Sequence, residues 1–149
     1  MQRLTMQKQR TVSVLFCLLF LSATSVAQRY WMQQGGGVTI DEAADISIDS
    51  AGNIYATGYF TSLANFGVTP YPVFSLSSYG TTDIYLAKLD TSGLYQWVIK
   101  AGGAGSDRPF AIKTDAAGNS YITGFFYDTA TFGSQVISSS GLQDVFVAK

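Results

Sequence analysis

Hydrophobic and polar residues alternate strictly from Ala44 to Asp49. This period of two predicts a β-strand over residues 43–49 with one apolar and one polar face. Two further segments, 53–60 and 83–89, are apolar or aromatic on both sides, so we expect strands covered on both faces. A fourth strand is predicted over 94–100, ahead of a glycine-rich loop. The short connections predict antiparallel hairpins, and therefore a four-stranded sheet.

Asp-to-Gly turns separate the first two strands and the last two. In the first turn we expect a positive φ at Gly52 and hydrogen bonds from the turn amides to Asp49. A calcium loop is the alternative, but it needs about six to eight oxygen ligands, and one carboxylate is present here. Asp83 and Asp144 are expected to cap turns in the same way. The repeated turn positions are Asp49, Gly52, Asn53, Asp115, Gly118 and Asn119.

The pattern occurs twice along the chain. DSAGNIYATGYF begins at Asp49, and DAAGNSYITGFF begins 66 positions later. GTTDIYLAK begins at Gly80, and GLQDVFVAK begins 61 positions later. The segment 68–79 is five residues longer than its counterpart 134–140, and because insertions collect in loops we expect both segments to be loops. A strand-rich repeat of about 60 residues indicates a stacked or radial β array.

We therefore predict an all-β protein, a partial β-propeller of antiparallel four-stranded blades, with a β-sandwich as the alternative. The propeller is expected to contain a leading strand over 29–36, a first blade over about 43–101 and an incomplete second blade over about 109–149. Trp31 and Trp97 occupy equivalent positions and are expected to fill the space between blades, although tryptophan also stacks on sugars.

The first 27 residues have the composition of a secretory signal peptide. A basic start is followed by the apolar run 11–21 and by small residues before Gln28, which predicts cleavage after Ala27. An uncleaved membrane anchor is the alternative, but it needs about 20 apolar residues. We expect a secreted or cell-surface protein whose mature chain has no stable membrane span.

The predicted mature chain excludes several chemistries. Residues 28–149 contain no Cys and no His, which excludes thiol nucleophiles, disulfides and His-ligated zinc there. Ten acidic and six basic residues follow Ala27, so the net charge is 6 − 10 = −4, and no basic groove for nucleic acid is expected. We expect no cofactor and no metal.

Polar residues beside the glycines are the candidate ligand-binding positions. Asp41, Glu42, Asp107 and Arg108 fall in the predicted loops between the fourth strand of one unit and the first of the next. In propellers such loops surround the central channel, where ligands bind; simple solvation of these loops is the alternative. Asp41 with Glu42 also offers a carboxylate pair of the glycosidase type, but no orienting partner accompanies it.

The ordered motifs D-x-x-G-N-x-Y-x-T-G-x-F, F-G and G-x-x-D-[IV]-[YF]-[LV]-A-K, with W and GG, resemble the SBBP-type β-propeller repeat over 29–149. That family occurs in secreted and surface proteins of bacteria, and the resemblance implies a fold and an export route but no activity. The expected function is a non-catalytic scaffold that binds a protein or glycan. The alternative is the N-terminal fragment of a secreted propeller enzyme with catalytic residues beyond Lys149. Further blades are expected in a full-length protein, and residues 28–149 alone are predicted to aggregate or oligomerise.

Overall fold

The computed structural model describes residues 30–149, and the predicted signal peptide lies outside the described residues. Within 30–149 every regular element is a β-strand, which confirms the all-β class. No helix in this part of the chain is long and apolar enough to cross a membrane.

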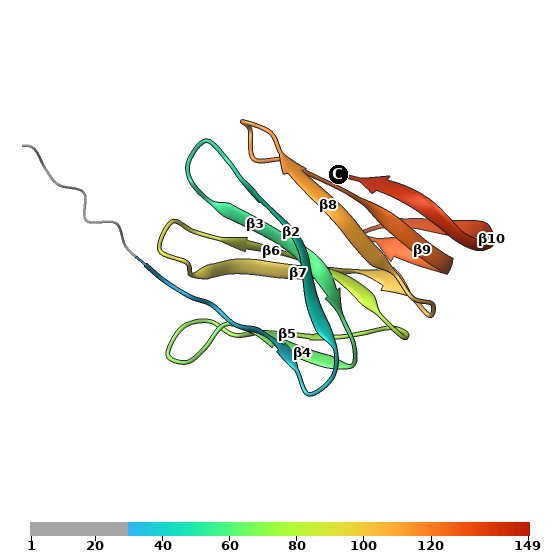
Figure 1. The fold of residues 1–149 in the computed structure, drawn as a ribbon, viewed down its shortest axis with the longest axis horizontal. Coiled ribbons are helices and arrows are strands. Elements are labelled where there is room, and N and C mark those ends of the chain that lie inside the picture. The colour runs from blue at the N-terminus through green and yellow to red at the C-terminus, as the bar shows by residue number, and fades with distance from the viewer. Residues whose placement is uncertain (1–29) are drawn as a thin grey trace, which may run out of the picture.

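The first blade is a four-stranded antiparallel sheet. Its strands are β2 (Asp41–Ile48), β3 (Ile54–Phe60), β6 (Asp83–Leu89) and β7 (Tyr95–Gly103), and they follow one another in this order across the sheet (Figure 1). Most side chains of β3 and β6 are buried irrespective of which face they occupy, as their two-sided apolar pattern predicts.

The second blade repeats the first in strand register. It contains β8 (Arg108–Thr114), β9 (Ser120–Phe132) and β10 (Gln135–Ala148). The pair Ile46↔Ala56 of blade one recurs as Ile112↔Ile122. A register shift also recurs, between Ala43 and Asp45 in β2 and between Pro109 and Ala111 in β8. The sequence repeat is therefore a repeat of backbone pairing.

The segment 68–79 is not only a loop, and in this respect the sequence prediction is wrong. It contains β5 (Phe74–Ser77), which pairs with β4 (Leu63–Phe66). In blade two the equivalent hairpin is continuous with β9 and β10. The connection spans 67–73 in blade one and 133–134 in blade two, so the five-residue difference lies entirely in the hairpin turn.

The glycine-rich segment that follows residue 100 was also expected to be a loop, but it is a strand. β7 continues to Gly103, where Gly102 and Gly103 pair with the outer part of β9. The cause is a close backbone approach, because a Cβ at Gly103 would overlap the carbonyl oxygen of Thr129. Of the leading strand predicted over 29–36, the described residues form a strand only at its end, in β1 (Gly35–Gly37), which pairs with β4. The first strand of each unit also starts earlier than predicted, so Asp41 and Glu42 belong to β2 and Arg108 belongs to β8 rather than to loops.

The two blades pack face to face around one apolar core, with the inner strands β2 and β8 side by side (Figure 1). A second cluster covers the opposite face of blade one, beneath the sheet β1–β4–β5. The interblade core consists of Tyr55, Ile84, Ala101, Ile112, Ile122, Phe126, Ala130 and Phe146. This radial stacking of repeated sheets is a partial β-propeller rather than a sandwich.

Candidate functional site

Two connecting segments meet at one end of the blade interface. The Thr81 amide donates a hydrogen bond to the Gly105 carbonyl at 3.1 Å, and the Asp107 amide donates to the Thr82 carbonyl at 2.8 Å. The hydroxyl oxygens of Thr82 and Ser106 lie 2.7 Å apart. The connection between β5 and β6 is thus tied directly to the connection between β7 and β8.

Asp107 holds this junction together from inside. Its side chain is fully buried, and its carboxylate accepts hydrogen bonds from the amides of Gly103 at 2.7 Å and Tyr127 at 3.1 Å. Burial raises the pKa of the Asp107 carboxyl. Asp41 makes the equivalent bond to the Gly37 amide, also at 2.7 Å. Both carboxylates therefore anchor glycine-rich main chain.

Asp83, which sequence reasoning treated as a turn cap, is a second buried carboxyl at the junction. Its Oδ2 accepts a hydrogen bond from the Tyr79 amide at 2.5 Å, and its buried Oδ1 has no hydrogen-bond partner. A Cβ placed on Gly102, where φ is +139°, would lie 2.8 Å from both Asp83 Oδ1 and Asp107 Oδ2. Burial, followed by the neighbouring Asp107 charge, raises the pKa of Asp83 to about 6.

Arg108 and Glu42 converge on one aromatic ring. The Arg108 guanidinium lies over the ring of Tyr59, 4.1 Å from its centroid. Glu42 is opposite Tyr59 on the adjacent strand, and its carboxylate beside the Tyr59 hydroxyl raises the pKa of that hydroxyl. Of the four predicted ligand-binding residues, these two lie together around Tyr59, whereas Asp41 and Asp107 anchor backbone.

An open, mainly polar pocket of about 560 Å³ lies beside Arg108. It offers a guanidinium, a carboxylate, hydroxyl groups and an aromatic wall in which Phe125 meets Tyr127 edge to face at 5.9 Å. A polar ligand with an apolar face, such as a sugar or a peptide segment, suits these groups. The lining residues are Thr81, Ala104, Gly105, Ser106, Arg108, Phe125, Tyr127 and Asp128.

Sequence reasoning found only Arg108 among these lining residues. Phe125 is the equivalent of Tyr59 in the repeat, and Tyr59 lies in a strand predicted to be covered on both faces, so the pattern gave no sign that Phe125 lines a pocket. Asp128 has φ +56° and Ser62, 66 positions earlier, has φ +58°. A short polar residue recurs two positions after each aromatic pair, Tyr59-Phe60 and Phe125-Phe126, and this recurrence is the sequence signal for the residue with positive φ.

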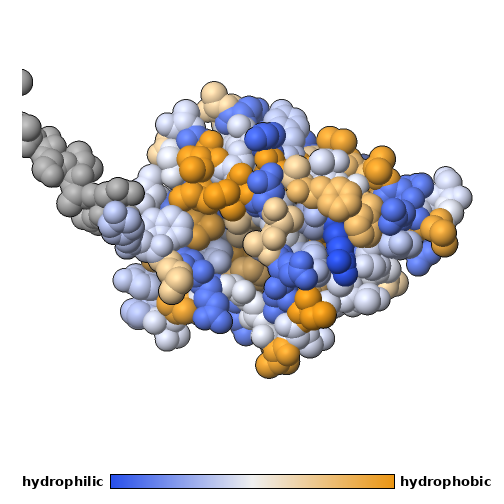
Figure 2. All heavy atoms as spheres, in the orientation of Figure 1, coloured by the Kyte–Doolittle hydropathy of each residue, from blue (hydrophilic) through white to orange (hydrophobic). Residues whose placement is uncertain are grey.

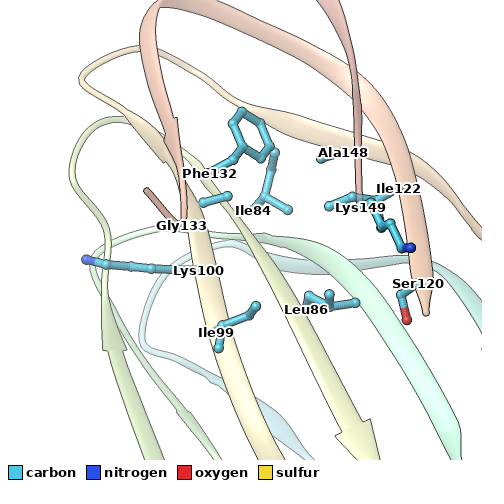
Figure 3. Close-up of a pocket in the computed structure, with 11 residues that line it drawn as sticks. Ile84, Leu86, Ile99, Lys100, Ser120, Ile122, Phe132, Gly133, Ala148 and Lys149 are labelled. Atoms are coloured by element: carbon cyan, nitrogen blue, oxygen red, sulfur yellow. The ribbon is translucent and has the colours of Figure 1, made fainter. Parts of the chain in front are cut away.

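A smaller apolar pocket of about 180 Å³ lies between the blades (Figure 3). Ile84, Ile122 and Phe132 surround it, while the ammonium group of Lys100 points away from it (Figure 3). No Asp or Glu side chain lines this pocket, and its mainly apolar lining is that of a core that is not completely filled. We therefore place the candidate site at the polar pocket beside Arg108.

The repeated turns have the geometry of side-chain caps. Asp49 Oδ1 accepts hydrogen bonds from the amides of Ala51 and Asn53, both at 2.9 Å. Asp115 repeats this arrangement with Ala117 at 3.0 Å and Asn119 at 2.9 Å. These carboxylate oxygens are occupied by backbone donors, and hydrogen bonding lowers the pKa of both Asp49 and Asp115. Among the described residues no group of three or more His, Cys, Asp or Glu is placed to hold a metal ion.

The two tryptophans lie in different surroundings. Trp97 packs against the interblade core and meets Tyr55 edge to face at 6.1 Å. Trp31 lies against the turn at Gly93, and part of its ring is exposed. Neither tryptophan lines the pocket beside Arg108.

Comparison with known proteins gives one family match. Residues 31–66 match the family model described as SBBP, beta-propeller repeat. This span covers β1 to β4 and includes the first Asp-to-Gly turn. No curated protein matches the chain.

Proposed function

We propose that this chain, a β-propeller repeat protein of the SBBP type, is a non-catalytic, exported scaffold that binds a protein or glycan at the pocket beside Arg108. The observation that carries the proposal is the position of Arg108, stacked on Tyr59 at the rim of an open pocket with an aromatic wall. Arginine and aromatic side chains supply much of the binding energy at recognition surfaces.

A catalytic role has less support from the residues around this pocket. Asp41 and Glu42 are neighbours on β2, and successive side chains of a strand point to opposite faces. Their carboxylates therefore do not flank a common bond. Asp107 is buried and bonded to two amides, which removes it as an accessible general base. Binding is the use that the remaining exposed groups favour.

Export is the second part of the proposal. It is supported by the basic start, the apolar run 11–21 and the small residues ahead of Gln28. A propeller scaffold outside the cytoplasm would meet polysaccharides and surface proteins, which are the ligand classes that suit a polar pocket with an aromatic wall.

Isothermal titration against a panel of neutral and acidic oligosaccharides and extracellular-matrix peptides tests the binding role. Arg108→Ala should weaken binding of any ligand found by about tenfold or more, because it removes the charged donor at the pocket rim. Lys113→Ala, on the same strand but away from the pocket, is the matched control and should bind like the wild type. Equal affinities for wild type and Arg108→Ala would place the ligand elsewhere.

A further inference from the structure

The contact between the two blades joins two different faces of the repeated sheet. Ile84 of blade one is 1% exposed, and Ile112 of blade two, in the same core cluster, is fully buried. Tyr55 of blade one is buried with them. Blade one therefore contributes the face of β3 and β6 that carries Tyr55 and Ile84, and blade two contributes the face of β8 and β9 that carries Ile112.

Both of these faces occur a second time on the chain, and there each has exposed apolar residues. Val145 is the equivalent of Ile84 and is 82% exposed, and Val147 beside it is also exposed. Ile46 is the equivalent of Ile112 and is 59% exposed. Ile46 borders a groove of about 820 Å³ whose apolar lining includes Phe66 and Leu89. Figure 2 shows hydrophobic side chains interrupting the polar surface in several places, including over the β2–β3 hairpin.

A strand edge without a partner among the described residues lies beside the exposed face of Val145 and Val147. β6 is hydrogen-bonded to β3 on one side and to β7 on the other, whereas β10, its equivalent, pairs only with β9 among the described residues. The equivalent of 97–101 in β7 is the segment 31–35, most of which lies ahead of β1 and outside any strand. Met32 in this segment is almost fully exposed. The chain thus carries both an open edge and a segment at the position of the repeat that pairs with this edge in blade one.

We propose that a second copy of this chain docks head to tail, with its segment 31–35 along the edge of β10 and its Ile46 face over Val145 and Val147. The register follows from blade one. Ile84↔Ala101 and Lys88↔Trp97 become Val145↔Gly35 and Lys149↔Trp31 of the second copy. The contact is heterologous, since two different surfaces meet, and it adds a strand to an exposed edge.

The internal interface also indicates how strongly two copies associate. Within the chain Asp45 Oδ2 accepts a hydrogen bond from the Ile112 amide, and Ser47 Oγ accepts one from the Thr114 amide, both at 2.9 Å. The equivalents of Asp45 and Ser47 on β8 are Ala111 and Lys113. Two copies therefore meet without these acceptors, so their contact is weaker than the one between blades and is reversible.

Sedimentation velocity and light scattering of the purified chain over a range of concentrations test the proposal. Wild type should associate as concentration rises. Val145→Lys and Ile46→Lys alter exposed positions on opposite faces, so each should fold, as circular dichroism would show, and each should be monomeric. An equimolar mixture of the two variants should form a one-to-one complex, because each retains the face that the other lacks.

Other outcomes would overturn head-to-tail docking. A wild type that stays monomeric at every concentration would mean that another polypeptide, such as a further blade, covers these faces. A single variant that still dimerises would show a contact between two identical faces. Arg108→Ala should associate like the wild type, so a failure of the proposed ligand site is distinguishable from a failure of this proposal.

Restoring the missing acceptors tests the register. Ala111→Asp combined with Lys113→Ser should tighten association by about tenfold, the effect of one charge-assisted hydrogen bond. Lys113→Ser alone is the control for the removal of a charge. If the double variant associates no more tightly than this control, the assigned register is wrong.

Discussion

The carboxylate of Asp45 in β2 accepts a hydrogen bond from the backbone amide of Ile112 in β8 at 2.9 Å, across the boundary between two blades. Ile112 is fully buried, so its amide has no access to water as an alternative partner. This bond is also the main cause that lowers the pKa of Asp45. The inner strands of the two blades are thus joined by a side chain rather than by a backbone ladder.

Replacement of Asp45 by Ala should lower the free energy of unfolding by about 1–3 kcal/mol, the cost of leaving a buried amide without a partner. Urea denaturation of the purified chain measures it. Asp45→Asn keeps an acceptor oxygen and should lose less. If Asp45→Ala unfolds at the same urea concentration as the wild type, the bond does not join the blades in solution.

The turn glycine should tolerate few replacements. Gly52 has φ +84°, and a Cβ there would lie 3.1 Å from the Thr91 side chain. We expect Gly52→Val to cost more than about 1 kcal/mol, because a β-branched residue is strained in this region. Gly52→Asn should cost less, since asparagine adopts positive φ more readily. Ser50→Ala should be nearly neutral, because its one side-chain hydrogen bond is long and exposed. Similar denaturation midpoints for Gly52→Val and Ser50→Ala would contradict this view of the turn.

Stability should fall as pH rises from about 4 to about 7. Burial raises the pKa of Asp83 to about 6, and the facing Asp107 adds to this shift while Lys100 opposes it. An unfolded aspartate releases its proton near pH 4, so the folded state holds more protons between these values. The stabilisation is complete below about pH 4 and is lost as pH passes through about 6.

Urea denaturation at several pH values should show a loss of about 2–3 kcal/mol over this interval. Asp83→Asn should weaken the dependence, because it removes one titrating group and keeps an acceptor for the Tyr79 amide. Asp107, whose pKa is also raised by burial, accounts for the fall that remains. The lowered pKa values of Asp45, Asp49 and Asp115 act below the ordinary aspartate pKa and do not interfere. A stability that rises between pH 4 and pH 7 would show that Asp83 is ionised throughout.

The export hypothesis predicts a defined mature N-terminus. Expressed in a bacterium with a compatible secretion system, the chain should be recovered outside the cytoplasm and should begin at Gln28. Intact-mass measurement of the secreted material checks this. Secreted chains that retain Met1 would be incompatible with cleavage after Ala27.

Much of the fold was predictable from local pattern. The strand β6 was placed at its observed bounds, and β3 and β7 within a few residues, because alternation and turn residues act over short distances. The repeat itself indicated the radial architecture, since a sheet that is apolar on both faces needs neighbours on both sides. The capping role of Asp49 also followed from its place ahead of a glycine turn.

Only the tertiary structure decided which glycines form strands and which polar residues meet. Gly102 and Gly103 look like a loop, but both pair with β9, and the Thr129 carbonyl of β9 leaves no room for a side chain at Gly103. Asp107 was predicted to lie in an accessible loop, as a ligand-binding or solvated residue, yet folding buries it against two amides. Asp83 and Asp107, 24 positions apart in the sequence, face each other only because β6 and the β7–β8 connection converge. Alternation and turn signals are local, whereas burial and pairing are set by partners that the sequence places far away.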